Sequence, residues 1–128
     1  MQTILVVDDS PTIRRMVRTA LAALTGVVFV EASSGLRAIE VLGLQPVHLV
    51  VLDLNMPDMH GLDVIRFLRT HAKYRQLPVM VLTTRGDDTS RDAAMDAGAS
   101  LYLTKPFAPS ALVAAARAQL EAHAPRRV

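Results

Sequence analysis

Apolar residues gather in five short runs along the chain, separated by longer stretches of mixed polarity. The runs are rich in Val, Ile and Leu and are bounded by turn-forming residues, which is typical of strands buried in a sheet. They are Thr3–Val7, Val27–Glu31, His48–Asp53, Pro78–Thr83 and Ser100–Leu103.

Each run is followed by a stretch with helical signals. The first helix is predicted to begin with Ser10 as its cap and Pro11 as its first residue. Its apolar residues recur every three or four positions, and Gly26 is expected to end it. The other predicted helices are Gly35–Leu42, Leu62–His71, Asp88–Ala97 and Ser110–Ala122.

Strand and helix alternate five times, which predicts an α/β fold with a parallel sheet covered by helices on both faces. Right-handed crossovers then give a doubly wound (βα)5 sandwich. In such folds the ligand site lies beyond the carboxyl ends of the strands. The residues to consider therefore lie just after Val7, Asp53, Thr83 and Leu103, the ends of four predicted strands.

Composition narrows the class of protein. With 128 residues, 51% of them hydrophobic and 20% charged, the chain fits one globular domain. It has no cysteine and no apolar run of membrane-spanning length, so we expect a soluble, cytoplasmic protein without a membrane contact. The net charge is +2, and the Arg14, Arg15 and Arg18 cluster is interpreted as a solvated helix face. Nucleic-acid binding is not predicted.

Polar residues stand at four of the predicted strand ends. Asp8 and Asp9 follow the first strand, Asp53 ends the third, Thr83 ends the fourth and Lys105 follows the fifth. Three carboxylates in one crevice repel one another, and a hard divalent cation relieves that repulsion. An all-oxygen site favours magnesium, manganese or calcium over zinc. Lys105 and the Thr83 hydroxyl suit the oxygens of a phosphoryl group, and a carboxylate can be its acceptor.

Each of these residues also has a simpler interpretation. Asp8 and Asp9 alone fit acids beside a helix start, Thr83 a strand-end residue, and Lys105 a surface lysine. Asp53 is harder to explain in this way, because an acid that follows an apolar run is rarely buried without a partner. The conjunction of all four sites favours phosphoryl chemistry at Asp53.

Five sequence motifs resemble the response-regulator receiver domains, and among them the CheY-like regulators of two-component and chemotaxis signalling. They are ILVVDDS at 4 to 10, LVVLDLNMPDMHGLD at 49 to 63, VMVLTT at 79 to 84, DAGAS at 96 to 100 and YLTKPF at 102 to 107. Together they span nearly the whole chain and are highly specific. The resemblance implies a flavodoxin-like sandwich with strand order 2-1-3-4-5.

The same resemblance assigns roles to the acids. Asp53 would be the phosphoacceptor. Asp9 and Asp53 would bind Mg²⁺ directly together with the backbone carbonyl of Asn55, and Asp8 would act mostly through water. Mn²⁺ is the alternative ion.

It also implies a switch. Thr83 and Lys105 would hold phosphoryl oxygens, and Tyr102 would be an aromatic residue that turns inward when Thr83 moves. The Lys105–Pro106 peptide bond would be cis.

Three positions depart from the CheY pattern. Leu54 stands in place of a tryptophan, Thr84 in place of an alanine, and Arg85 in place of an acid. Thr84 is expected to crowd the loop or Tyr102. Arg85 is expected to alter either the access of water to the phosphoryl group or the choice of partner; the alternative is an exposed loop arginine without a role.

The resemblance implies the function of a phosphorylation-dependent switch and not of an enzyme, apart from catalysis of its own phosphorylation and dephosphorylation. The resemblance also implies two partners, a sensor histidine kinase and a downstream protein that docks on the fourth helix, fifth strand and fifth helix. A monomer or a weak phosphorylation-dependent dimer is expected.

Residues 1–123 are predicted to form the receiver domain and 124–128 a C-terminal tail. A receiver cut from a hybrid kinase or a DNA-binding regulator, and an aspartate-nucleophile phosphohydrolase, remain the alternatives.

Overall fold

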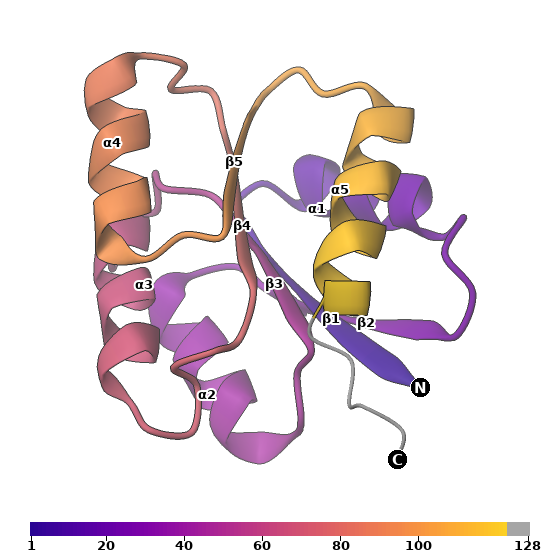
Figure 1. The fold of residues 1–128 in the computed structure, drawn as a ribbon, viewed down its shortest axis with the longest axis horizontal. Coiled ribbons are helices and arrows are strands. Elements are labelled where there is room, and N and C mark those ends of the chain that lie inside the picture. The colour runs from indigo at the N-terminus through magenta and orange to yellow at the C-terminus, as the bar shows by residue number, and fades with distance from the viewer. Residues whose placement is uncertain (123–128) are drawn as a thin grey trace.

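The structure is a computed structural model that describes residues 1–122. A five-stranded parallel sheet runs through its centre, with strand order β2-β1-β3-β4-β5 (Figure 1). The strands are β1 (Gln2–Val7), β2 (Val27–Ala32), β3 (Leu49–Leu52), β4 (Val79–Thr83) and β5 (Leu101–Thr104). The predicted fold class and strand order are confirmed.

The helices cover the two faces of the sheet unequally. They are α1 (Pro11–Leu21), α2 (Gly35–Leu44), α3 (Gly61–Thr70), α4 (Asp88–Ala97) and α5 (Pro109–Ala122). Figure 1 shows α2, α3 and α4 on one side of the sheet and α1 and α5 on the other. This arrangement is the doubly wound sandwich expected from the alternation of elements.

Alternation along the strands builds a separate core under each helix layer. In β1, the side chains of Leu5 and Val7 pack toward α2, α3 and α4, whereas Ile4 and Val6 pack toward α1 and α5. All four are almost fully buried. Successive side chains of a strand point to opposite faces, so a strand buried on both faces is apolar at every position.

The first helix ends earlier than predicted. The helix stops at Leu21 and not near Gly26, because the chain tightens into hydrogen bonds between residues three apart, such as Leu24 N–H to Leu21 O at 3.0 Å. Leu24 still packs in the core from this turn. Gly26 has a φ of 72° and leads into β2. The apolar repeat therefore continued past the helix.

The remaining boundaries match the predictions or differ from them by one or two residues, and α4 matches at both ends. The proposed division between a domain at 1–123 and a tail at 124–128 lies outside the described residues. None of the helices within residues 1–122 combines the length and apolar character that crossing a bilayer requires.

Candidate functional site

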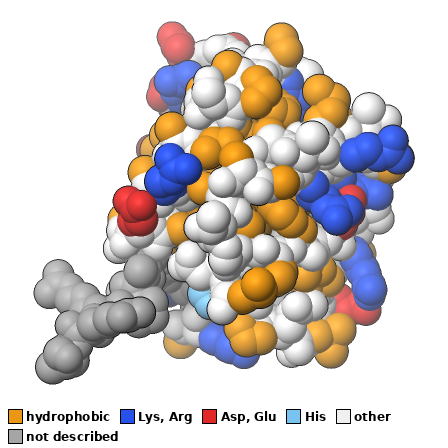
Figure 2. Space-filling view, turned by 90° about the vertical axis from the view of Figure 1, so that its right-hand side faces the viewer, with side chains coloured by type: hydrophobic (Ala, Val, Ile, Leu, Met, Phe, Trp, Pro, Cys, Tyr) orange, Lys and Arg blue, Asp and Glu red, His pale blue; other side chains and the backbone are white. Residues whose placement is uncertain are grey.

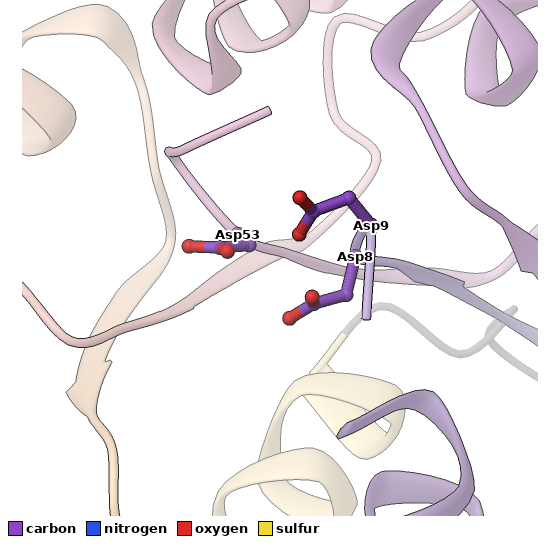
Figure 3. Close-up of side chains that lie close together, drawn as sticks. All are labelled: Asp8, Asp9 and Asp53. Atoms are coloured by element: carbon purple, nitrogen blue, oxygen red, sulfur yellow. The ribbon is translucent and has the colours of Figure 1, made fainter. Parts of the chain in front are cut away.

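Three carboxylates meet beyond the carboxyl ends of β1 and β3. Val7 and Leu52 are register partners, so Asp8 and Asp53, which follow them, emerge side by side. Figure 3 shows Asp8, Asp9 and Asp53 with their carboxylates pointing to the same side. One oxygen of each lies within 4.8 Å of the others. Asp8 and Asp53 are buried, with 4% and 6% of their surface exposed, and Asp9 is exposed.

Lys105 supplies the positive charge of the site. Its Nζ donates to Asp8 Oδ2 at 2.7 Å and to Asp53 Oδ2 at 3.5 Å. Its side chain is 11% exposed. Buried charges require partners of opposite sign, so this contact accounts for two buried acids and a mostly buried lysine together. The peptide bond between Lys105 and Pro106 is cis, as the family resemblance implied.

Backbone groups hold the two buried acids. The N–H of Ser10 donates to Asp8 Oδ1 at 2.9 Å, and the N–H of Asn55 donates to Asp53 Oδ1 at 3.3 Å. These bonds leave the Oδ2 atoms of both acids facing Lys105. The orientation of each carboxylate is thus fixed by the turn that follows its own strand.

Thr83 lies on β4 and Tyr102 on the adjacent strand β5. Thr83 is fully buried at the end of β4, and its Oγ1 accepts a hydrogen bond from the N–H of Arg85 at 3.4 Å. Tyr102 is buried, and its hydroxyl donates to the backbone carbonyl of Arg85. The guanidinium of Arg91 lies 5.4 Å from the centre of its ring. Burial, assisted by the negative charge of Asp87, raises the pKa of the Tyr102 hydroxyl.

The two residues after Thr83 that depart from the family pattern lie on the surface. Thr84 and Arg85 are both exposed. The Nε of Arg85 donates to Oδ1 of Asn55 at 3.1 Å, which connects the loop after β4 to the loop after β3. Arg85 is therefore not an isolated surface arginine. Its backbone carbonyl and its side chain join Tyr102 and Asn55 through one residue.

Arg14 contacts the site, although its position in the sequence predicted a solvated face. Its side chain is only 16% exposed. Its Nη1 donates to the backbone carbonyl of Asp8 at 2.7 Å, and its Nε donates to Glu31 at 2.9 Å. Arg18 pairs with the other oxygen of Glu31. The only signal in the sequence was an acid, Glu31, at the end of an otherwise apolar run.

The described surface also has a hollow away from the acid cluster. A cavity of about 620 Å³ lies at the amino ends of the strands, between Gln2, Val47 and Pro78. None of the predicted site residues lines it. Charge and hydrogen bonding identify the candidate site better than concavity does.

The donor atoms at the acid cluster suit a hard divalent cation. Three carboxylates converge there, and the whole chain has no cysteine that would favour a softer metal. The residues present therefore fit a metal of the magnesium type.

Comparisons with known proteins agree with this arrangement. Residues 4–117 match the response regulator receiver domain. Chemotaxis protein CheY1 of Helicobacter pylori is 36% identical over 110 residues, which cover 85% of this chain and 89% of that protein. The transcriptional regulatory protein KdpE of Mycobacterium tuberculosis is 40% identical over 92% of this chain and 50% of its own length.

A solved structure gives the same result. The chemotaxis response regulator CheY4 of Vibrio cholerae superposes with a TM-score of 0.85 and 30% identity, over 94% of this chain and 99% of that one. Receiver domains work with histidine kinases and downstream targets, and they are generally not classical enzymes. The chain therefore belongs to the response regulator receiver domain family, as a CheY-like two-component phosphoacceptor.

Proposed function

We propose that Asp53 accepts a phosphoryl group from the phosphohistidine of a sensor kinase, and that this modification switches the protein toward a downstream partner. The observation that carries the proposal is the setting of Asp53. It is a buried carboxylate with two further acids within 4.8 Å and the Lys105 ammonium at 3.5 Å. A buried acid with this much charge around it is typical of a reacting group.

In the proposed transfer, a carboxylate oxygen of Asp53 attacks phosphorus and the bond between phosphorus and the imidazole nitrogen breaks. The phosphoryl group moves to Asp53 as an acyl phosphate, and the electron pair returns to the imidazole of the kinase. Mg²⁺, held by Asp9, Asp53 and the Asn55 backbone carbonyl, with Asp8 acting through water, would neutralise the oxygens that carry the negative charge. Mn²⁺ would serve in its place.

Thr83 and Lys105 are the proposed contacts of the transferred group. The Lys105 ammonium already faces Asp53 Oδ2, on which a phosphoryl group would be carried. The Thr83 hydroxyl lies at the end of the adjacent strand. A charged donor and a neutral donor would thus bind the phosphoryl oxygens from two strands.

The proposed switch is the loop that follows Thr83, together with Tyr102. The Tyr102 hydroxyl bonds to the Arg85 carbonyl, so a displacement of this loop changes the environment of the ring. Phosphorylation shifts an existing equilibrium only if the phosphoryl group contacts one conformation better than the other. The bond that Thr83 Oγ1 accepts from the Arg85 N–H ties the loop to this hydroxyl, so a Thr83 that moves toward the phosphoryl group moves the loop with it.

The proposed output surface comprises α4, β5 and α5. It carries Met95, which is 43% exposed, and the exposed alanines Ala111, Ala114 and Ala118. Figure 2 views the side that carries α1 and α5 and shows hydrophobic side chains spread among Lys and Arg. We propose a monomer that docks on a protein target through this surface, or a weak dimer formed after phosphorylation. Similarity to chemotaxis regulators supports a target in motility.

A cytoplasmic location belongs to the same proposal, because the kinase that donates the phosphoryl group consumes ATP.

The test is intact mass after incubation with acetyl phosphate, a small phosphoryl donor, with and without Mg²⁺. Wild type should gain one phosphoryl group only when the metal is present. The Asp53→Asn variant should gain none. Asp63→Asn, which alters an exposed acid of α3, should behave as wild type. Absence of an adduct in folded wild type with Mg²⁺ would overturn the proposal, as would an adduct of equal yield in Asp53→Asn.

A further inference from the structure

The N-terminus of α2 is capped by two side chains, and one of them comes from a distant segment. Oγ of Ser34, the N-cap residue, accepts a hydrogen bond from the N–H of Arg37 at 3.1 Å. The carboxylate of Asp58 accepts from the N–H groups of Gly35 and Leu36, at 3.2 and 3.1 Å. The first N–H groups of a helix have no acceptors within the helix and carry partial positive charge. Asp58 therefore completes the cap of α2 from the β3–α3 loop, Leu54–His60.

The electrostatics of Asp58 agree with this role. Partial desolvation raises its pKa, but hydrogen bonds, chiefly from the N–H groups of Leu36 and Gly35, outweigh it, so the pKa of the carboxyl lies below its usual value. Asp58 is thus ionised at neutral pH and acts as an anion bound at the helix terminus.

Close packing fixes the same loop. Gly35 has no side chain, and a Cβ placed there would lie 2.9 Å from Cβ of Met59. At the end of the loop, a Cβ on Gly61 would lie 2.7 Å from the backbone oxygen of Asp53. The N–H of Gly61 donates to the carbonyl of Leu54 at 2.9 Å. The β3–α3 loop is therefore held against α2 by Asp58 and Met59, and its two ends are joined by the hydrogen bond between Gly61 and Leu54.

In the sequence, Asn55 lies between Leu54, which bonds to Gly61, and Asp58, which bonds to the start of α2. It is the residue whose backbone carbonyl is the proposed third protein ligand of Mg²⁺. Magnesium demands near-ideal octahedral geometry, so a ligand on a loose loop binds it less well than a ligand on a fixed one.

We propose that Asp58 is a positioning residue for the metal, because it anchors the β3–α3 loop on α2 and so keeps the Asn55 carbonyl beside Asp9 and Asp53. The inference rests on the proposed function, which supplies the metal and its ligands. It adds a residue that lies outside the acid cluster and acts through its bonds to the start of α2.

The test is the Mg²⁺ affinity of metal-free protein, measured by calorimetric titration at a temperature where melting curves show every variant to be folded. Asp58→Ala should bind Mg²⁺ about tenfold more weakly than wild type, the usual loss when the support of a metal ligand is removed. Asp58→Asn should fall between the two, because its amide oxygen still accepts one hydrogen bond. Asp63→Asn, which removes a negative charge from the first turn of α3 without touching α2, should match wild type.

A second readout separates positioning from simple stabilisation. The phosphorylation rate of Asp58→Ala should be low at limiting Mg²⁺ and should return to the wild-type rate at saturating Mg²⁺. A residue that only caps α2 would lower the melting temperature and leave the Mg²⁺ affinity unchanged, and this result would overturn the inference. An equal loss of affinity in Asp63→Asn would also overturn it, since charge alone would then explain the effect. If wild type itself binds no Mg²⁺, the proposed function falls with the inference; if wild type binds and Asp58→Ala binds equally well, the inference alone falls.

Discussion

The Nζ of Lys105 lies 2.7 Å from Oδ2 of Asp8, and both side chains are almost completely buried. The two residues are 97 positions apart in the chain. They meet because the carboxyl ends of β1 and β5 lie on the same side of the parallel sheet. The contact means that the acid cluster of the metal-free protein is partly neutralised by the protein itself. Asp9 is the acid of the cluster with which Lys105 forms no ion pair in the described structure.

Replacement of Lys105 by Met should destabilise the metal-free protein by about 2 kcal/mol, because two buried carboxylates lose their charge partner. Mg²⁺ should reduce the difference from wild type, since it supplies positive charge at the same acids. Urea denaturation in EDTA and in Mg²⁺ measures both effects. Lys73→Met, which alters an exposed lysine, is the control. Equal stability of Lys105→Met and wild type in EDTA would contradict the neutralising role of Lys105.

Replacement of Asp9 by Ala should abolish Mg²⁺ binding and leave the metal-free protein equally stable or more stable. The reason is that the substitution relieves repulsion from Asp8 and Asp53 without breaking a contact of Lys105. Thermal melts with and without Mg²⁺ test this: wild type should gain stability with the metal and Asp9→Ala should not. Clear destabilisation of the metal-free variant would show that charge repulsion at Asp9 does not lower the stability of the metal-free protein.

Replacement of Arg85 by Ala should speed loss of the phosphoryl group from Asp53. Arg85 bonds to Asn55 across the loops that flank the site, so its removal opens a path for water. We expect a change of about threefold or more, which corresponds to about 0.7 kcal/mol in activation free energy. The measurement is decay of the intact-mass adduct after removal of acetyl phosphate, with the exposed Arg66→Ala as control. If neither Arg85→Ala nor Arg85→Glu alters the decay rate or partner affinity, Arg85 has no modulating role.

Two glycine-to-alanine substitutions should have opposite effects on stability. Gly98 ends α4 with a φ of 115°, and a Cβ there would lie 2.6 Å from Cγ of Arg69. Gly98→Ala should therefore cost about 2 kcal/mol, from backbone strain and displacement of Arg69. Gly43 lies inside α2, where an added Cβ would meet no atom within 4 Å, and Gly43→Ala should stabilise by about 0.5–1 kcal/mol. Urea denaturation measures the change in the free energy of unfolding for both variants. Destabilisation by both would contradict the assignment of strain to Gly98.

The Glu31 cluster should make stability depend on pH in the acidic range. Burial raises the pKa of Glu31, but the hydrogen bonds and charges of Arg14 and Arg18 outweigh it and hold the pKa below its ordinary value of 4.5. A folded-state pKa that is depressed contributes stability above the unfolded pKa and loses it as the pH falls through the folded pKa. Glu31→Gln should therefore be less stable than wild type at pH 7, by roughly 1 kcal/mol for this partly exposed pair of bridges. The difference should shrink as the pH falls below about 4.5, and a difference that is constant with pH would contradict the assignment.

Local sequence was sufficient for the order of elements and for the acid cluster. Short apolar runs bounded by turn-forming residues indicated buried strands, and the carboxyl ends of parallel strands lie on the same side of a sheet. Asp8, Asp53, Thr83 and Lys105 could therefore be placed together from the hydrophobic pattern. The end of α1 could not, because Leu24 continues the apolar repeat while the backbone has already left the helix.

The contacts that hold the site in place were decided by tertiary structure alone. Asp58 reaches the N-terminus of α2, Arg85 reaches Asn55, and Arg14 reaches the backbone of Asp8. Each joins segments whose separation in space depends on the path of a loop, and an exposed or mixed-polarity segment carries no periodic pattern from which that path can be predicted. The sequence by itself determined which groups could react, because strand ends are encoded by hydrophobic pattern. The tertiary structure decided which polar partners orient those groups, because hydrogen bonds form only between atoms that the completed fold brings within about 3 Å.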